Sequence, residues 1–401
     1  MPTMPSPAAP RPLEGLLVVS LEQAVAAPFA TRQLADLGAR VIKIERPGSG
    51  DFARGYDTAV HGLSSYFVWL NRGKESLTLD VKSDSGRAVL GTLLEKADVF
   101  VHNLGPGAVG RLGFGVEALA ELNPRLVDCA VNGYGSTGSW AQRKAYDLLI
   151  QCQTGLVSIT GGPETGARVG ISVADIAAGM YAFSGVLAAL LGRATTGVAR
   201  PVEVSLFDAL AEWMSQPAYY TAFTGVEPRR LGTHHATIAP YGAYPAADGT
   251  EVLFSIQNDV EWKAFCTDFL EDVAIVDDER FSSGANRVAN RAELDVFVTA
   301  AFARRTSDEV VALLDRLRIA NARINQVADF LDHPVLRERG RWHEVQTPGG
   351  PAPALAPPID IAGLTPVMGD VPALGEHTDA LLAEFGLEPG AIEELHADGV
   401  V

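Results

Sequence analysis

The fold of this chain is decided by residues 15–45, which read GLLVVSLEQAVAAPFATRQLADLGARVIKIE. The apolar runs at residues 15–20 and 40–45 each predict a short strand. Between them, residues 28–37 have helical spacing, with Pro28 in the first turn and Gly38 at the carboxyl end, where these residue types are favoured. The segment therefore predicts a strand–helix–strand unit.

The same alternation continues along the chain. Further helices are predicted at 85–97, 116–122, 176–192 and 206–220, and further strands at 98–102, 126–131 and 200–205. Strands that alternate with helices are typical of an α/β layer with a mostly parallel sheet. We therefore expect the α/β fold class.

A length of 401 residues predicts two domains, because one core rarely grows that large. Residues 225–241 contain glycine, proline and paired histidines, which is typical of an irregular loop. A second α/β segment is expected from about 244 to 327, followed by loops, strands and a terminal helix. The proline-rich residues 1–12 predict a disordered tail.

Composition excludes some function classes. The formal net charge of −17 argues against nucleic-acid and anionic-membrane binding, although a local group of cations could still hold a small polyanion. The apolar segment 176–192 is short for a membrane span and contains glycine and serine, so it predicts a buried helix. Cys129, Cys152 and Cys266 are interpreted as buried thiols in a reducing compartment, which predicts a cytoplasmic protein without disulfides.

One acidic residue has an unusual setting. Asp147 precedes Leu148, Leu149 and Ile150, which we expect to be buried, and an unpaired carboxylate is unfavourable there. Such a residue is either paired for structural reasons, as a helix cap or an ion-pair partner of Lys144, or is used chemically. Asp175 enters a similar run of small apolar residues.

Taken together, several motifs resemble those of the class III coenzyme A transferases of the CaiB/BaiF type. They are residues 21–28, 38–47, 70–80, 103–107, 111–113 and 374–379. The resemblance covers about residues 13–387. It implies a large Rossmann-like domain formed by residues 13–220 and 328–401, a smaller α/β domain at 225–327, and a homodimer of interlocked ring-shaped subunits.

The resemblance also implies a site. Asp147 lies at the position of the family's nucleophilic aspartate, which would form a mixed anhydride with the acyl group and then an aspartyl-CoA thioester. Coenzyme A would be a substrate, with no metal and no permanently bound cofactor. The residues implied to bind CoA or substrate are Val25, Arg46, Lys74, Asn103, Arg111, Lys144, Tyr146, His234 and His235. The two histidines would approach from a loop of the small domain to bind an acceptor carboxylate or place a proton.

The substrate remains open at this point. Residues 22–28 and 237–241 look most like the branch that uses succinyl-CoA or mesaconyl-CoA and C4–C5 dicarboxylic acids. No glycine-rich run occurs around 225–262, which argues against oxalate. An acyl-CoA racemase is the enzymatic alternative, but Tyr146 stands where a racemase has a histidine base. Asp175 is then interpreted as a cap of the helix at Ile176. The non-enzymatic alternative is an inactive acyl-CoA-binding protein.

Overall fold

The computed structural model describes residues 10–401, which form two compact units. The first unit contains the chain up to residue 154, residues 170–215 and residues 337–401, and the second contains residues 155–169 and 216–336. These boundaries differ from the predicted ones: residues 155–169, which were expected in the large domain, belong to the second unit. The predicted tail falls mostly outside the described residues.

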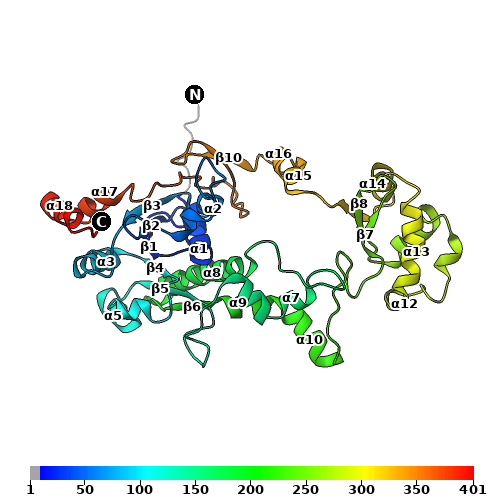
Figure 1. Ribbon diagram of the computed structural model, residues 1–401, viewed down its shortest axis with the longest axis horizontal. Coiled ribbons are helices and arrows are strands. Elements are labelled where there is room, and N and C mark those ends of the chain that lie inside the picture. The colour runs from blue at the N-terminus through cyan, green and yellow to red at the C-terminus, as the bar shows by residue number, and fades with distance from the viewer. Residues whose placement is uncertain (1–9) are drawn as a thin grey trace. The chain divides into compact units, whose positions relative to one another are not determined.

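The first unit is built on a six-stranded parallel sheet with the order β3-β2-β1-β4-β5-β6 (Figure 1). The strands are β1 (Leu17–Leu21), β2 (Arg40–Glu45), β3 (Lys74–Thr78), β4 (Val99–His102), β5 (Val127–Asn132) and β6 (Val202–Ser205). This is the strand order of dinucleotide-binding α/β folds, in which the direction of winding reverses between β1 and β4. Ligands of such sheets bind beside that reversal, at the carboxyl ends of the strands.

The helices of the first unit cover this sheet. They are α1 (Ala26–Asp36), η1 (Phe52–Gly55), α2 (Ser65–Asn71), α3 (Asp84–Lys96), α4 (Ala108–Arg111), α5 (Val116–Leu122), α6 (Asp147–Gln153), α8 (Val173–Thr196), α9 (Leu206–Trp213), α17 (Thr378–Glu384) and α18 (Pro389–Ala397), with a hairpin of β10 (Trp342–Val345) and β11 (Ala352–Leu355). The predicted helix at 206–220 is in fact two helices, α9 and α10 (Ser215–Thr224).

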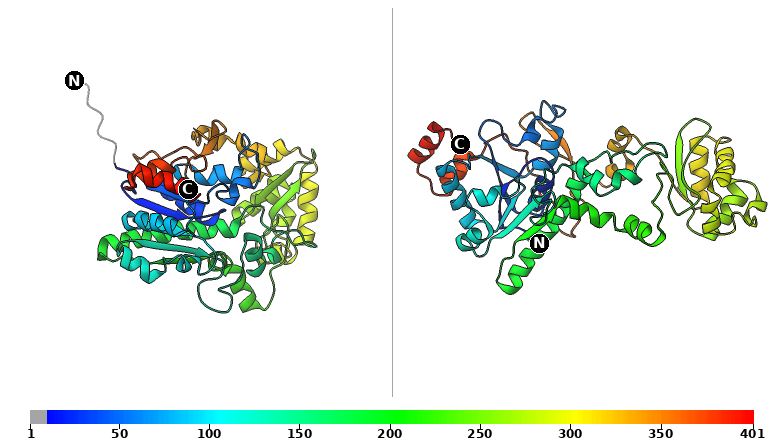
Figure 2. Two further views of the ribbon diagram at one scale, coloured as in Figure 1. Left: turned by 60° about the vertical axis from the view of Figure 1, so that its left-hand side comes forward. Right: turned by 60° about the horizontal axis from the view of Figure 1, so that its bottom comes forward.

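The end of the chain belongs to the core of the first unit. Leu382, Leu395 and Val400 pack in one buried cluster with Val19 of β1 and Leu90 of α3. Both figures of the ribbon show α17 and α18 at the β3 side of the sheet (Figures 1 and 2). The Val400 carbonyl accepts a hydrogen bond from the Asp80 amide at 2.7 Å, so the last residues hold the turn that follows β3.

The long apolar segment forms α8. By length and composition alone, this one helix of the described residues could cross a membrane, and 39% of its most apolar window is buried. Buried helices of globular proteins pass the same test. In this structure α8 packs lengthwise on α1 and also against α9 and β5. The close contact depends on Gly179, where a Cβ would lie 2.6 Å from the Ala26 carbonyl oxygen.

The second unit has its own core. Its sheet is antiparallel, with β7 (Tyr241–Pro245), β8 (Glu251–Ser255) and β9 (Ala320–Arg323), and so differs from the predicted α/β type. The remaining elements are α7 (Leu156–Ile159), α11 (Asp259–Ala264), η2 (Phe265–Phe269), η3 (Val273–Val276), α12 (Gly284–Ala289), α13 (Arg291–Phe302), α14 (Ser307–Arg316), α15 (Val327–Leu331) and α16 (Pro334–Glu338). Phe254, Phe265, Phe269 and Phe302 stack at its centre.

Candidate active site

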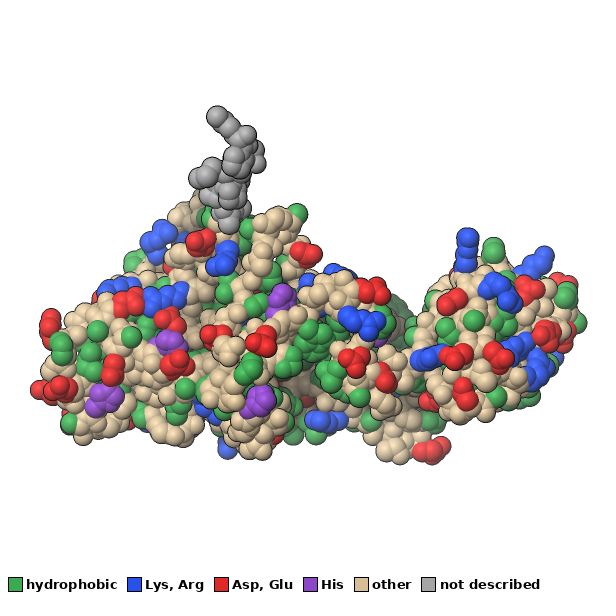
Figure 3. Space-filling model, turned by 90° about the horizontal axis from the view of Figure 1, so that it is seen from above, with side chains coloured by type: hydrophobic (Ala, Val, Ile, Leu, Met, Phe, Trp, Pro, Cys, Tyr) green, Lys and Arg blue, Asp and Glu red, His purple; other side chains and the backbone are tan. Residues whose placement is uncertain are grey.

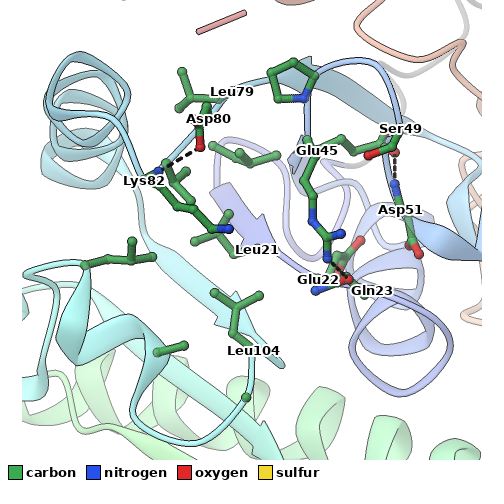
Figure 4. A pocket seen from close by; sticks show the side chains of 18 of the residues that line it. Leu21, Glu22, Gln23, Glu45, Ser49, Asp51, Leu79, Asp80, Lys82 and Leu104 are labelled. Atoms are coloured by element: carbon green, nitrogen blue, oxygen red, sulfur yellow. Dashed lines mark hydrogen bonds between the residues drawn. The ribbon is translucent and has the colours of Figure 1, made fainter.

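A crevice of about 800 Å³ opens at the carboxyl ends of β1 to β4, where the winding of the sheet reverses. Leu21 ends β1 and Leu104 follows β4, and both line it (Figure 4). Three cations also line the crevice: Arg46 after β2, Lys82 after β3 and Arg111 at the end of α4. Glu22, Glu45, Asp51 and Asp80 line it as well, and the first three are ion-paired with Lys74, Arg54 and Lys43. The three cations can therefore attract a polyanion although the chain is acidic.

Two of these cations, Arg46 and Arg111, were predicted. The Arg46 guanidinium donates to Gln23 Oε1 at 2.6 Å, and Arg111 donates to the Pro106 carbonyl at 3.1 Å. Both side chains belong to exposed residues, so each guanidinium keeps donors for a ligand. Elsewhere, acidic and basic side chains are interspersed over the face shown in Figure 3.

Lys82 was missed by the sequence analysis. It is exposed, lines the crevice, and follows Asp80, whose carboxylate accepts a hydrogen bond from the Lys82 amide at 3.0 Å (Figure 4). The signal that could have found it is position, because a lysine in the turn after a parallel strand lies at the ligand-binding edge of the sheet.

Lys74, which was predicted to line the CoA site, is a buried structural residue instead. Its side chain has no exposed surface. Its Nζ donates to Glu22 Oε1 at 2.7 Å, Asn71 Oδ1 at 3.0 Å and the Pro28 carbonyl at 3.1 Å. Burial lowers the pKa of Lys74 to about 8 although the Glu22 carboxylate opposes this. All three donors of the ammonium are used, so none remains for a phosphate.

Lys74 is one member of a buried charge network beneath the crevice, formed by Glu22, Lys43, Asp51 and Lys74. The Lys43 ammonium lies 2.8 Å from Asp51 Oδ2 and 3.4 Å from Glu22 Oε1. Burial alone would raise the pKa of Glu22, but the two ammonium groups outweigh it and the pKa is lowered. The carboxylates therefore stay ionised through pairing.

Asn103 and Val25 also have structural surroundings. Asn103 accepts a hydrogen bond from the Gln23 amide and donates to the Gln23 carbonyl, both at 2.8 Å, and so fixes the turn between β1 and α1. Val25 is the N-cap residue of α1, and its side chain is 3% exposed. Neither residue is among those that line the crevice.

Asp147 is hydrogen-bonded through both oxygens. It begins α6, where Oδ2 accepts from Gln151 Nε2 at 2.7 Å, and Oδ1 accepts from the Ala174 amide in the first turn of α8 at 2.7 Å. Its carboxylate therefore caps the positive end of α8. The expected burial of the three apolar residues that follow Asp147 is confirmed for Ile150. It was wrong for Leu148 and Leu149, which are 42% and 47% exposed.

Lys144 and Tyr146 are both exposed. The predicted ion pair of Lys144 with Asp147 is not formed, and within residues 10–401 no acid lies at ion-pair distance from Lys144. Tyr146 is 66% exposed and lies close enough to Tyr56 to interact with it electrostatically.

Asp175 lies beside Asp147 and differs from it. The helix α8 begins at Val173 with Ser172 as N-cap residue, so Asp175 lies inside the first turn and does not cap the helix as predicted. Among the described residues, none donates a hydrogen bond to its carboxylate. Burial raises the pKa of Asp175 to about 7, and the negative charge of Asp147 adds to the rise. Desolvation and a like charge are thus both present.

Tyr56 lies near this acid pair. Burial raises the pKa of Tyr56 to about 12, and the charges of Asp51 and Asp175 add to the rise. Its hydroxyl therefore stays protonated at neutral pH and can donate a hydrogen bond. The rings of Tyr56 and Tyr66 meet edge to face with centroids 5.4 Å apart, which fixes the position of Tyr56.

The paired histidines lie in the second unit and pack on β7. His235 stacks on Tyr241 with ring centroids 5.0 Å apart, and His234 meets Tyr244 edge to face at 5.2 Å. A Cβ on Gly242 would lie 2.3 Å from the His234 ring, so this glycine leaves room for the histidine. Both histidines are half-buried parts of an ordered loop.

The cysteine prediction was right for two of three residues. Cys129 and Cys266 are buried, whereas Cys152 on α6 is exposed, and all three are free thiols. Burial raises the pKa of Cys129 and of Cys266 to about 12. No group of three or more potential metal ligands occurs in residues 10–401.

The family model for "CoA-transferase family III" matches residues 13–378. The chain belongs to CoA-transferase family III. The resemblance found in the sequence is therefore confirmed, and the protein is a CoA-transferase. A crystal structure of a CaiB/BaiF family protein from Brucella suis has the same fold, with a TM-score of 0.83, 32% identity, and coverage of 94% of this chain and 100% of that one.

Curated relatives of this family III CoA-transferase use several acids. The succinyl-CoA:glutarate CoA-transferase of Mus musculus is 33% identical, with coverage of 98% of this chain and 90% of the relative. The succinyl-CoA:mesaconate CoA-transferase of Haloarcula marismortui is 34% identical, with coverage of 94% of this chain and 97% of the relative. The acetyl-CoA:oxalate CoA-transferase of Acetobacter aceti is 35% identical (87% and 91%), so overall identity gives no support to the sequence argument against oxalate.

Proposed function

We propose that this enzyme moves CoA from an acyl-CoA, such as succinyl-CoA, to a small dicarboxylic acid through a covalent aspartyl intermediate. The names of the glutarate and mesaconate relatives support the dicarboxylate class. The observation that supports the covalent route is the pair of neighbouring acids at the start of α8, one hydrogen-bonded and one free. Coenzyme A is a substrate here, and the proposal needs no metal or permanently bound cofactor.

The geometry favours Asp175 over Asp147 as the nucleophile. Each Asp147 oxygen accepts a hydrogen bond, which withdraws electron density from the carboxylate, holds it in place and makes it a weaker nucleophile. Asp175 is free of hydrogen bonds from the described residues, and its raised pKa marks a poorly solvated, more basic carboxylate. The sequence-based assignment of Asp147 stays an untested prediction, and Asp147 is better explained as the residue that orients the first turn of α8.

The proposed steps need no net proton transfer. The Asp175 carboxylate attacks the thioester carbonyl, the C–S bond breaks, and CoA thiolate leaves a mixed anhydride. The thiolate then attacks the aspartyl carbonyl and releases the donor acid, which leaves an aspartyl-CoA thioester. The acceptor carboxylate repeats both steps in reverse order. Backbone amides and the protonated Tyr56 hydroxyl are suited to stabilise the oxyanions.

Mapping the covalent adduct tests this proposal. The enzyme is incubated with succinyl-CoA, trapped with hydroxylamine or borohydride, digested and analysed by mass spectrometry. We expect the modification at Asp175 and none at Asp147. A modification at Asp147 would restore the sequence-based assignment, and no adduct at either acid under turnover would overturn the covalent mechanism. A racemase would instead exchange the α-hydrogen for deuterium in D2O without an acceptor acid.

We infer that the CoA phosphates bind at Arg46, Lys82 and Arg111. Lys82→Gln should raise the KM for the CoA thioester about tenfold with little change in kcat, because the interaction exists in both ground and transition states. The difference from wild type should shrink in high salt, since an exposed charge is screened. Lys96→Gln is the matched control, because Lys96 is also exposed but lies near the amino ends of β1 and β2. Equal KM values for Lys82→Gln and wild type would contradict the proposed role of Lys82 in CoA binding.

The dependence of kcat/KM on pH should reflect the ionisation of Asp175 and its interaction with Asp147. Attack requires ionised Asp175, so kcat/KM should rise with pH through about 7 and level off above it. Asp147→Asn keeps an oxygen that can accept the Ala174 amide but removes the like charge, which lowers the pKa of Asp175. The acidic limb of the profile should therefore move to lower pH. An unmoved limb in an active variant would contradict the coupling, and complete loss of activity would favour Asp147 as nucleophile.

Two further proposals concern assembly and location. We infer that two copies interlock as a homodimer, because large apolar side chains such as Leu191 and Phe223 are 71% and 86% exposed in the single chain. Light scattering should give twice the chain mass.

A reducing, cytoplasmic location is supported by the three free thiols.

A further inference from the structure

A single buried carboxylate joins three segments at the edge of the crevice. Asp51 is 2% exposed and lines the crevice on the same side as Glu22 and Gln23 (Figure 4). Its Oδ1 accepts the Ala24 amide at 3.0 Å and the Ala53 amide at 2.9 Å, and its Oδ2 lies 2.8 Å from Lys43 Nζ. One side chain therefore ties the β1–α1 turn and η1 to the charge network.

The β1–α1 turn needs such a restraint. Ala24 has φ of 62°, in the left-handed region that non-glycine residues seldom occupy. A non-glycine residue keeps this strained backbone conformation only where contacts with its surroundings enforce it. The Ala24 amide donates to Asp51 Oδ1, and the preceding residue, Gln23, accepts from Arg46 at 2.6 Å. The position of the Arg46 guanidinium is thus linked to Asp51 through two residues.

The Asp51 carboxylate also fixes the position of the short helix η1, which is followed by Tyr56. Asp51 is the N-cap residue of η1, and Tyr56 is the C-cap residue of that short helix. The charge of Asp51 also contributes to the raised pKa of Tyr56. Asp51 therefore orients the crevice on one side and the acid-pair region on the other.

We infer that Asp51 is a positioning residue for CoA-thioester binding, which acts by fixing Ala24 and thereby the Gln23–Arg46 pair. The inference rests on the proposed binding of CoA in the crevice. It assigns Asp51 no contact with the reacting atoms. Its removal should mainly weaken binding, because Arg46 remains in the crevice but is no longer held in one arrangement.

The test separates positioning from stability. Asp51→Ala should raise both the Kd for CoA and the KM for the thioester about tenfold or more. Asp51→Asn keeps an oxygen for the Ala24 and Ala53 amides and should retain most of the binding, although Lys43 loses the nearer of its two carboxylate partners and keeps only Glu22 at 3.4 Å. Asp36→Asn is the matched control, since Asp36 is another buried carboxylate of the first unit, paired with Arg72 at 2.7 Å near the end of α1. It should lower the unfolding midpoint and leave Kd unchanged.

The outcomes distinguish the proposals. Wild-type Kd in folded Asp51→Ala, or an equal rise in Kd for Asp36→Asn, overturns the positioning role. If Asp51→Ala does not fold, Ala24→Val gives the answer, because a β-branched residue is strained at this φ while Asp51 is intact. Unchanged CoA binding in Ala24→Val also overturns the inference. If wild-type enzyme fails to bind CoA at all, the proposed function fails first and this inference fails with it.

Discussion

Asp175→Asn should lower kcat by about a thousandfold or more, because an amide cannot form the mixed anhydride that carries the proposed reaction. The change removes a group that accepts no hydrogen bond from the described residues, so the fold should tolerate it. Binding of CoA should remain within a few fold of wild type, since the cations of the crevice are untouched. The measurements are the rate of CoA transfer to a panel of dicarboxylic acids and the Kd for CoA.

Asp147→Asn is the control for this prediction. It lies beside Asp175, has a similar size, and loses a charge in the same way, yet it should keep measurable activity. The opposite order, with Asp147→Asn inactive and Asp175→Asn active, would return the nucleophile to the position indicated by the sequence. Equal loss in both variants, with no adduct at either acid, would contradict the covalent route.

Lys74→Met should unfold far more easily than wild type, with a loss of about 3–5 kcal/mol in the free energy of unfolding. The change leaves Glu22 as a buried carboxylate with only Lys43, at 3.4 Å, as cationic partner. Adding Glu22→Gln should recover part of the loss, because the unpaired charge is then removed as well. Urea unfolding followed by fluorescence gives the free energy of unfolding of wild type, the Lys74→Met variant and the double variant.

Lys82→Met is the reciprocal control. An exposed lysine should cost little stability when replaced, yet its loss should weaken CoA binding. If Lys74→Met is as stable as wild type and weakens CoA binding instead, the structural role of Lys74 is contradicted and the sequence-based assignment to the CoA site holds.

The sheet was largely predictable and the site only partly so. Residues 40–45 were predicted as a strand and form β2 with the same bounds, because apolar runs between turn residues determine buried parallel strands. The family resemblance pointed to Arg46 and Arg111, and both line the crevice, while their contact with CoA stays a prediction. Lys74 was misassigned because its motif places it at the start of β3, and nothing local in the sequence shows that Glu22, 52 residues earlier, lies 2.7 Å away.

The two acids show a second limit of the sequence. Asp147 and Asp175 both precede apolar residues, and the pattern cannot tell which carboxylate is hydrogen-bonded. That difference depends on the Ala174 amide, which approaches Asp147 only after α6 and α8 have packed. The exposure of Leu148 and Leu149 has the same origin, because burial of a short helix depends on which face meets its neighbours.

The attachment of the chain's end to β3 has a consequence for synthesis. The turn with Asp80 and Lys82 is held by the Val400 carbonyl, and Gly399 lines the crevice. All six strands of the parallel sheet are synthesised by residue 205, but the wall of the crevice is complete only once residues 399 and 400 have been added. The crevice is therefore built jointly by two segments of the chain that are about 300 residues apart in sequence, so it cannot form from the strands alone.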